Sequence, residues 1–324
     1  MKKLNATLFP IICAVICTLS FLGCSPAQKE NDVVRVGYRP TVTVDLAFFK
    51  ALEEGVFKNQ GLEIELKPYG RPDLILSALK SGQIDASLGV PLEMLISEAQ
   101  KGNYSSLMYL VWYFSADTPY DGLVVLDKSE IKTISQLEGK VIGSHPSRQV
   151  TYFVETMYPK SKKVRAYNPA TPYIALKSKD VDAVYVLEPF LTIAKKDPSL
   201  RVLESGAISS RLFDEKTVPA AASVVSAIWQ EKHPDVAQKF MRIAMEQFLK
   251  TDTAPDQSLS WRINLLGMPK YGGRDSYLAS HVYEPVGSTI KDIDTAALQS
   301  FLEKLSEVGL VTGVVDFEKM TPEL

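Results

Sequence analysis

A nine-residue stretch that occurs twice is the feature that most constrains the fold of this chain. Residues 78–86 return as residues 175–183, and the two copies are identical at six of nine positions. Each copy lies in a window that begins at a tyrosine, Tyr69 or Tyr167, and ends at a proline, Pro91 or Pro189. Both windows have the pattern of a loop, a short amphipathic helix, a tight turn and a buried apolar strand. The repetition predicts two α/β lobes built on one plan, with equivalent loops facing a cleft; the alternative is chance recurrence of a common helix-ending sequence.

The length and the order of the predicted elements support two lobes. A chain of 324 residues that is 46% hydrophobic is long enough for about two domains. Predicted strands at 33–38, 62–67, 106–111 and 123–126 alternate with helices at 46–54, 147–157 and 190–196, a pattern typical of parallel sheets flanked by helices. We expect lobe one to contain residues 33–117 and 222–324 and lobe two residues 118–221, with a strand at 218–225 returning to lobe one.

The N-terminus has the pattern of an export signal. Lys2 and Lys3 precede an apolar run at residues 8–22, which is too short for a comfortable membrane span. The run ends in Leu22-Gly23-Cys24, which resembles a bacterial lipobox, although Phe21 departs from the usual pattern. We therefore expect residues 1–23 to be removed, Cys24 to be lipidated, and residues 24–32 to form a tether. The alternative is an ordinary secretory signal that is cut further along.

Cysteine usage and charge exclude several function classes. All three cysteines lie within the first 24 residues, so the mature body has no disulfide, thiolate metal site or cysteine nucleophile. With three histidines in the chain, a histidine-rich metal site is not expected, and no cofactor is predicted. The formal net charge of −2 becomes −4 when the two lysines of the signal are removed. No basic run is present, so nucleic-acid binding is not expected.

Three arginines follow predicted strands at the rim of the expected cleft: Arg39, Arg71 and Arg148. In open α/β sheets, ligands bind beyond the carboxyl ends of the strands, where helix N-termini present free N–H groups. A forked guanidinium there holds a carboxylate, sulfonate or phosphate through two hydrogen bonds. We expect these arginines to contact the solute; for each, the alternative is a solvated loop charge.

Aromatic side chains gather at the same rim. Trp112 begins a run of three aromatic residues, and Tyr69 and Tyr167 begin the two repeat windows. One or more of these rings is expected to stack on a flat solute, against the alternative that they pack between the lobes.

Other candidate ligand contacts lie in loops that follow predicted strands. Glu188 precedes a helix start, where its carboxylate is a candidate acceptor for an amine or ring N–H, or else a helix-end charge. Asp45 and Asp73 are predicted to cap helices. His145 is expected to contact the ligand or to lie in its loop rather than to act as a general base. The remaining loop candidates are Thr43, Asp45, Pro91, Ser144, Ser147 and Asn168.

Taken together, these pieces resemble the bacterial solute-binding proteins of ABC importers that serve sulfonates, nitrate or taurine, and thiamine-pyrimidine compounds. The resemblance covers most of the mature chain and weakens after about residue 264. It includes the first repeat copy and the segments Val34-Arg35-Val36-Gly37-Tyr38, Leu137-Glu138-Gly139-Lys140, Asp182-Ala183 with Glu188-Pro189, and Pro234-Asp235-Val236. It implies a two-lobed periplasmic-binding-protein fold of type II, an α/β fold whose lobes are joined by two crossing segments.

The resemblance also implies a function. We expect a monomeric, lipid-anchored receptor of the cell envelope that captures a small organic solute and delivers it to a membrane permease with its ATPase. The chain lacks a phosphate-binding loop, so the ATPase is a separate subunit. The alternatives are a sensor or adhesion lipoprotein, and an enzyme like the thiamine-pyrimidine synthases on the same fold. The ligand is expected to be a flat heterocycle, such as a vitamin-precursor pyrimidine or a flavin, or a small oxyanion such as a sulfonate.

Overall fold

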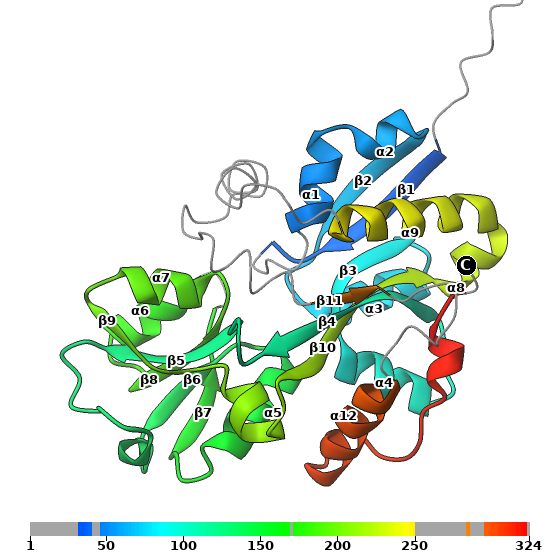
Figure 1. Cartoon of the computed structure of the whole chain (residues 1–324). Coiled ribbons are helices and arrows are strands. Elements are labelled where there is room, and N and C mark those ends of the chain that lie inside the picture. Colours follow the sequence, from blue (N-terminus) through cyan, green and yellow to red (C-terminus); the bar gives the residue numbers. More distant parts are fainter. Residues whose placement is uncertain (1–31, 41–45, 169–170, 250–282, 286–294, 323–324) are drawn as a thin grey trace, which may run out of the picture. The chain divides into compact units, whose positions relative to one another are not determined.

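The described residues form two mixed sheets, of six and five strands (Figure 1). The computed structural model describes residues 32–40, 46–168, 171–249, 283–285 and 295–322. Contacts divide the chain into residues 1–30 and residues 31–324, and both sheets belong to the second unit.

The first sheet has the strand order β11-β4-β10-β3-β1-β2. β1 pairs in parallel with β2 and β3, whereas β10 is antiparallel to both β3 and β4, and β11 is antiparallel to β4. The strands are β1 (Asp32–Tyr38), β2 (Leu62–Pro68), β3 (Ala86–Pro91), β4 (Ser106–Ser115), β10 (Thr217–Ser226) and β11 (Tyr283–Pro285).

The second sheet has the strand order β7-β6-β8-β5-β9. β6 pairs in parallel with β7 and β8, and β5 is antiparallel to β8 and β9. The strands are β5 (Asp121–Leu126), β6 (Val141–Ser144), β7 (Lys163–Ala166), β8 (Ala183–Leu187) and β9 (Leu200–Ser205).

The sheets, expected from the sequence to be parallel, are therefore mixed. Each sheet has a parallel half, in which the strands are linked by helices, and an antiparallel half. β4 belongs to the first sheet and leads directly into β5 of the second, while β10 returns after β9 to lie between β3 and β4 (Figure 1). A strand that returns along its neighbour must run antiparallel to it, which explains the mixed pairing.

The duplicated stretch builds the same unit in both sheets. The first sheet contains the order β1, β2, helix α3 (Pro72–Lys80) and β3. The second sheet repeats it as β6, β7, helix α6 (Pro172–Lys177) and β8. In the first copy, Asp85 Oδ2 accepts the backbone N–H of Arg35, and in the second, Asp182 Oδ2 accepts that of Val141, both at 2.8 Å. The shared aspartate thus fixes the register of the parallel strand pair in both sheets.

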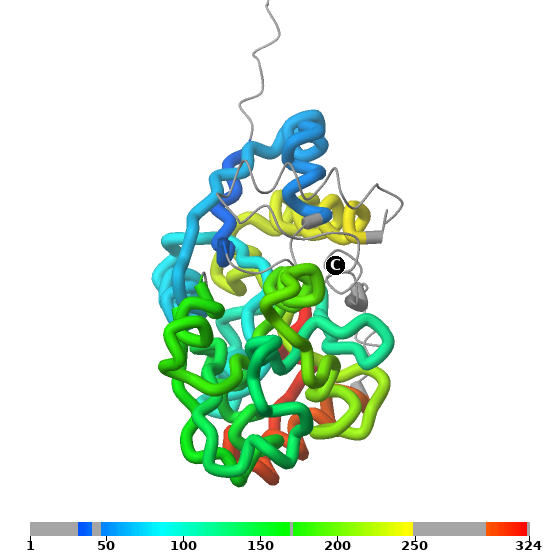
Figure 2. Tube along the Cα trace, turned by 90° about the vertical axis from the view of Figure 1, so that its left-hand side faces the viewer, coloured from blue at the N-terminus to red at the C-terminus, as the bar shows by residue number. Residues whose placement is uncertain are grey.

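Three helices cover one face of the first sheet: α1 (Leu46–Glu53), α2 (Val56–Asn59) and α9 (Pro234–Leu249). Phe48, Phe57 and Phe240 come from these three helices and form a buried aromatic cluster with ring centroids 4.9–6.1 Å apart. Figure 2 shows α9 beside the two N-terminal helices, far from them in sequence. The cluster holds α9, which follows β10 in the chain, against the two helices that precede β2.

A second apolar core is continuous between the other face of the first sheet and the second sheet. It joins Val111 of β4, Ile142 of β6 and Phe153 of the helix after β6. A third core, around Val184, Val186 and Leu191, fills the far face of the second sheet. The remaining helical segments are α4 (Leu92–Gln100), η1 (Ile134–Leu137), α5 (Arg148–Met157), α7 (Phe190–Lys196), η2 (Ile208–Phe213), α8 (Ala227–Lys232), α12 (Thr295–Glu307) and η4 (Phe317–Met320). Across the described residues, none of the helices combines the length and the apolar character that a membrane crossing requires.

Candidate functional site

A cavity opens where the carboxyl ends of β1, β3 and β8 approach the start of α5. It has two adjoining parts that share Arg39, His145 and Ser147. We call the narrower part the aromatic slot, about 50 Å³ in volume, lined by Arg39, Pro91, Trp112, Tyr113, Phe114, Tyr120, His145, Ser147, Gln149, Val150, Leu187, Ala220 and Ala221. We call the wider part the polar bay, about 510 Å³, lined by Arg39, Gly70, Arg71, Pro72, Asp73, Leu76, Glu93, Met94, Ser97, Glu98, Lys101, His145, Pro146, Ser147 and Arg148.

A bulge in β10 shapes the aromatic slot. Pro219 pairs with Tyr113 and Ala221 pairs with Trp112, so Ala220 is the extra residue between them. The bulge bends β10 at this point, and Ala220 and Ala221 line the slot together with Trp112, Tyr113 and Phe114 of β4. Trp112 is buried, and its indole N–H donates to Ser223 Oγ at 3.0 Å. The slot is thus a rigid apolar space suited to a flat group.

His145 is a neutral donor at the junction of slot and bay. Its Nδ1 accepts the backbone N–H of Ser147 at 3.2 Å, which leaves the ring proton on Nε2. Burial, and to a smaller extent the positive charge of Arg39, lower the pKa of His145 to about 3. Arg39 is itself buried and donates from Nη2 to the Gly89 carbonyl at 2.7 Å. At neutral pH the imidazole of His145 is therefore uncharged.

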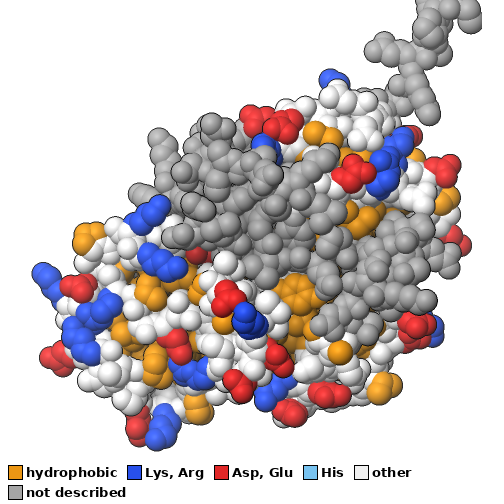
Figure 3. Space-filling model, viewed as in Figure 1, with side chains coloured by type: hydrophobic (Ala, Val, Ile, Leu, Met, Phe, Trp, Pro, Cys, Tyr) orange, Lys and Arg blue, Asp and Glu red, His pale blue; other side chains and the backbone are white. Residues whose placement is uncertain are grey.

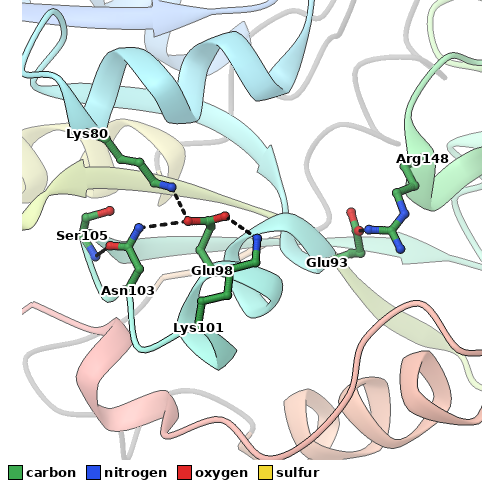
Figure 4. Close-up of polar contacts among 7 residues, drawn as sticks. All are labelled: Lys80, Glu93, Glu98, Lys101, Asn103, Ser105 and Arg148. Carbon is green, nitrogen blue, oxygen red and sulfur yellow. Dashed lines mark hydrogen bonds and ion pairs between the residues drawn. The ribbon is translucent and has the colours of Figure 1, made fainter.

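Two acidic side chains of the polar bay, Asp73 and Glu98, form ion pairs with neighbouring basic residues. Arg71 donates to both carboxylate oxygens of Asp73, at 2.9 and 2.5 Å. Glu98 accepts from Lys80 and Asn103 on one oxygen and from Lys101 on the other (Figure 4). Burial opposes ionisation of Glu98, but these donors outweigh it and hold its pKa at about 2.

Glu93 and Gln149 connect helices that belong to different sheets. Glu93 lies in the first turn of α4, is 1% exposed, and accepts from Arg148 Nη1 on α5 at 3.2 Å. Gln149 Oε1 accepts the backbone N–H of Glu93, and its Nε2 donates to the Ala220 carbonyl of β10, both at 3.2 Å. Burial raises the pKa of the Glu93 carboxyl, while the charges of Arg148 and Lys101 counteract that rise.

Seven of the candidates from the sequence line the cavity. Arg39, Pro91, Trp112, His145 and Ser147 line the slot, and Arg71 and Arg148 line the bay. Thr43, Asp45 and Cys24 lie outside the described residues. The prediction that Asp73 caps a helix was wrong, because Arg71 occupies the N-cap position of α3. Asp73 is the second residue of that helix, where it pairs with Arg71.

Two tyrosine candidates, Tyr69 and Tyr167, do not line the cavity. Each packs against a glycine instead. The Tyr69 ring covers Gly37 in β1, 3.4 Å from where a β-carbon would lie, and the Tyr167 ring covers Gly143 in β6 at 3.3 Å. The Tyr167 hydroxyl donates to the Tyr185 carbonyl at 2.8 Å. The two windows therefore place their first tyrosine equivalently, as a packing residue in the parallel half of each sheet.

Three other candidates also lie apart from the lining residues. The Ser144 hydroxyl donates to the carbonyl of its neighbour His145 at 3.2 Å. Asn168 is exposed, and its carbonyl accepts the Thr171 N–H. Glu188 is 1% exposed and accepts the Thr192 N–H and hydroxyl at 3.1 and 3.0 Å, at the start of α7. These contacts agree with the alternative that Glu188 is a charge at the end of a helix.

Sequence reasoning missed Glu93, Gln149 and Tyr120. Glu93 stands two residues after Pro91, and Gln149 one residue after Arg148, so the signal was adjacency to residues already nominated. Among the described residues, no cluster of histidine, cysteine, aspartate and glutamate has the arrangement of a metal site. On the face shown in Figure 3, basic and acidic side chains of the described residues are interspersed.

The family model described as NMT1/THI5 like matches residues 43–253, which is more than half of the chain. The chain belongs to the NMT1/THI5-like family. A protein of Brucella abortus, named only as a binding protein, is 23% identical over 264 residues, covering 79% of this chain and 78% of its own length. The family match includes the whole second sheet and, of the first sheet, β2, β3, β4 and β10, together with every residue that lines the cavity except Arg39.

Solved structures of periplasmic binding proteins share the fold of this NMT1/THI5-like chain. The aliphatic sulphonate binding protein SsuA of Escherichia coli superimposes with a TM-score of 0.62 at 18% identity, covering 90% of this chain and 97% of its own. The nitrate-binding protein NrtA of Synechocystis PCC 6803 gives 0.65 at 14% identity, with 89% and 84% covered. The predicted family resemblance and fold class are thereby confirmed.

Proposed function

We propose that this chain is the extracytoplasmic solute-binding subunit of an ABC importer. The observation that carries the proposal is one cavity with an apolar aromatic slot and a polar bay, joined at Arg39 and His145 and lined from both sheets. Ligand sites have this composition: mostly apolar walls with a few placed polar groups. The solved structures that share its fold are named for binding sulphonate and nitrate, which supports a role in binding rather than in catalysis.

The solute is proposed to be a flat heterocycle or a small organic oxyanion. Trp112, Tyr113 and Phe114 line the slot proposed to take a planar group, while Arg39 and the His145 Nε2–H lie at the junction, where an oxygen of the solute is proposed to bind. We retain the predicted lobes, residues 33–117 with 222–324 and residues 118–221, as the bodies that close on the solute. A ligand touching both lobes stabilises the closed arrangement, since only there does it make both sets of contacts.

The test is a thermal-stability screen of the full chain against vitamin-precursor pyrimidines, flavins, alkanesulfonates and nitrate. A solute that binds the folded state raises the melting temperature by mass action. Small-angle scattering with that solute should show a smaller radius than the ligand-free protein. No stabilisation by any of these compounds would favour a sensor or adhesion role for the same fold. An unchanged radius with a bound solute would reject closure and favour a rigid receptor.

Anchoring and delivery complete the proposal. We propose that Cys24 carries lipid at the outer face of a membrane, that residues 24–32 tether a monomer there, and that a separate permease and ATPase receive the solute. Lipid on the first residue keeps the receptor close to the permease, which raises the effective concentration of the partner. Mass spectrometry of the membrane fraction should show an acylated peptide beginning at Cys24, and an unmodified N-terminus further along would exclude the anchor.

A further inference from the structure

The last described stretch of the chain contacts elements of both proposed lobes. We call residues 295–322 the C-terminal strap; they comprise α12, the segment after it and η4. The lobes expected from the sequence place the whole strap in lobe one. In Figure 1, α12 lies beneath α4 and next to α5, and its side chains share one buried core with both helices. The strap therefore touches α4 of lobe one and α5 of lobe two at the same time.

The first half of the strap packs on lobe two. The Phe301 ring of α12 is 1% exposed and contacts two other rings. It stacks on Phe213 of η2 with centroids 5.6 Å apart, and it meets Phe153 of α5 edge to face at 6.5 Å. Just after α12, the Leu310 carbonyl accepts from Arg148 Nη2 at 3.3 Å. Phe213, Phe153 and Arg148 all belong to residues 118–221, so this half is attached to lobe two.

The second half of the strap is attached to lobe one. Gln100, the last residue of α4, accepts the Thr312 N–H on Oε1 at 3.2 Å and donates from Nε2 to the Gly313 carbonyl at 3.1 Å. Met320 of η4 is 1% exposed and lines a small cavity with residues of α3 and α4. η4 also contacts β4 of the first sheet. The two halves of one short segment are thus fixed to different lobes.

We propose that the C-terminal strap is a latch that holds the two lobes in the closed arrangement. Where α4 and α5 meet, the Glu93 N–H donates to Gln149 Oε1 at 3.2 Å, so opening the cavity separates these two helices. The strap then cannot keep its contacts with both. A segment that makes both sets of contacts only in the closed arrangement stabilises that arrangement, as a bound solute does. The inference rests on the proposed closure of the lobes and is independent of the identity of the solute.

The backbone amide of Glu93 reports closure without a solute. Glu93 is the second residue of α4, so its N–H has no partner within the helix, and its hydrogen bond goes to Gln149 of the other lobe. Each opening of the lobes breaks this bond and exposes the amide to exchange with water. A strap that stabilised only its own neighbourhood would leave the exchange rate of this amide unchanged, whereas a latch controls it from a distance.

The experiment follows hydrogen exchange of the Glu93 amide by NMR in the full, ligand-free chain. Gln100→Ala removes both hydrogen bonds of the second half of the strap and should speed this exchange about fivefold. Phe301→Leu removes the ring contacts of the first half and should speed it by a similar factor. Because a latch fails when either end is released, the double variant should exchange no faster than the faster single variant.

Each variant has a matched control. Gln299→Ala lies on the exposed side of α12, where Gln299 bonds only within its own helix to Glu303, and it should leave exchange at Glu93 as in the wild type. Phe240→Leu weakens the separate core under α9 and should likewise have no effect at Glu93.

Three results would overturn the latch. They are unchanged exchange at Glu93 in both single variants, strictly additive effects in the double variant, and equal acceleration of the amides of β1, which would indicate loosening of the whole fold. The thermal screen tests solute binding separately, since a receptor with a passive strap is still stabilised by its solute. The latch and the receptor function therefore fail separately.

Discussion

Arg148 Nη1 lies 3.2 Å from Glu93 Oε1, and this ion pair joins α5, which follows the second sheet's β6, to α4, which follows the first sheet's β3. The two partners differ sharply in exposure, since the side chain of Arg148 is 64% exposed and that of Glu93 is 2% exposed. Water therefore screens the arginine but not the carboxylate. The pair matters chiefly because it compensates a buried negative charge.

The first prediction concerns this pair. Arg148→Ala should lower the free energy of unfolding by about 1–2 kcal/mol, between the values for exposed and buried pairs, because it leaves the Glu93 carboxylate without its cation. Glu93→Gln in the Arg148→Ala background should recover part of that loss, since it removes the uncompensated charge. Urea unfolding of the two single variants and the double variant measures the coupling.

Arg242→Ala is the control for this cycle. Arg242 is exposed on α9 and pairs with Glu246 one turn away, so its removal should cost at most about 0.5 kcal/mol. Strictly additive effects of the Arg148 and Glu93 changes would show that the contact contributes no stability.

The second prediction follows from the burial of His145. Its pKa is about 3 in the folded protein and near 6.5 in the unfolded chain. Below pH 6.5 the unfolded state takes up a proton that the folded state refuses, so stability falls as the pH falls from 6.5 towards 3. The loss from this group is about 1.4 kcal/mol per pH unit, or about 2 kcal/mol at pH 5.

His145→Gln should therefore flatten the fall in the free energy of unfolding between pH 7 and pH 5. His233→Gln, at an exposed position, should leave the slope as in the wild type. If His145→Gln keeps the full acid sensitivity, the imidazole is protonated in the folded protein, and the neutral Nε2 donor is excluded.

The third prediction has the opposite sign. Asp121 is fully buried at the start of β5, where its Oδ2 accepts from the Tyr185 hydroxyl, and burial raises its pKa to about 6. Between its unfolded pKa of 3.8 and about 6, the folded state holds a proton that the unfolded state has released. Stability therefore falls as the pH rises through this range, by about 3 kcal/mol in all, and is constant above it.

Asp121→Asn cannot ionise, so its free energy of unfolding should lack this fall between pH 4 and pH 6. The contributions of Asp121 and His145 oppose each other below pH 6 and partly cancel in the wild type, so each must be measured in its single variant. Asp117→Asn, at an exposed site, serves as the control. The same pH profile in Asp121→Asn and the wild type would mean that the carboxylate is ionised when folded.

Local elements were predictable from the sequence because they depend on nearby residues. The helix predicted at 190–196 coincides with α7, Phe190–Lys196, and the strand predicted at 33–38 differs from β1 by one residue. Apolar alternation and the start signals of helices act over one or two turns. The antiparallel place of β10 between β3 and β4 was not predictable in this way, because it depends on contacts over more than a hundred residues.

The same distinction separates the residues of the candidate site that were predictable from the sequence from those that were not. Arg39 and His145 were found because both follow strands, and the carboxyl end of a strand is a local property. Glu93 and Gln149 lie inside helices and read as ordinary polar positions, and their burial arises only where α4 meets α5. The Tyr167 ring was expected at the cleft, but it fills the space that the absent side chain of Gly143 leaves in β6.

The last prediction returns to the repeated stretch, whose copies differ at the turn. Gly82 has φ +69° in the first copy, and Lys179 has φ +64° at the equivalent turn of the second. A left-handed backbone costs a residue with a β-carbon about 1–2 kcal/mol and glycine almost nothing, although glycine also loses more entropy on folding. Lys179→Gly should therefore raise the free energy of unfolding by about 0.5 kcal/mol, and Gly82→Lys should lower it by about 1 kcal/mol, both measured by urea unfolding. Lys162→Gly, at an exposed position before β7, controls for loss of a lysine. A loss of stability in Lys179→Gly would mean that the lysine side chain makes a stabilising contact that outweighs the strain of its backbone.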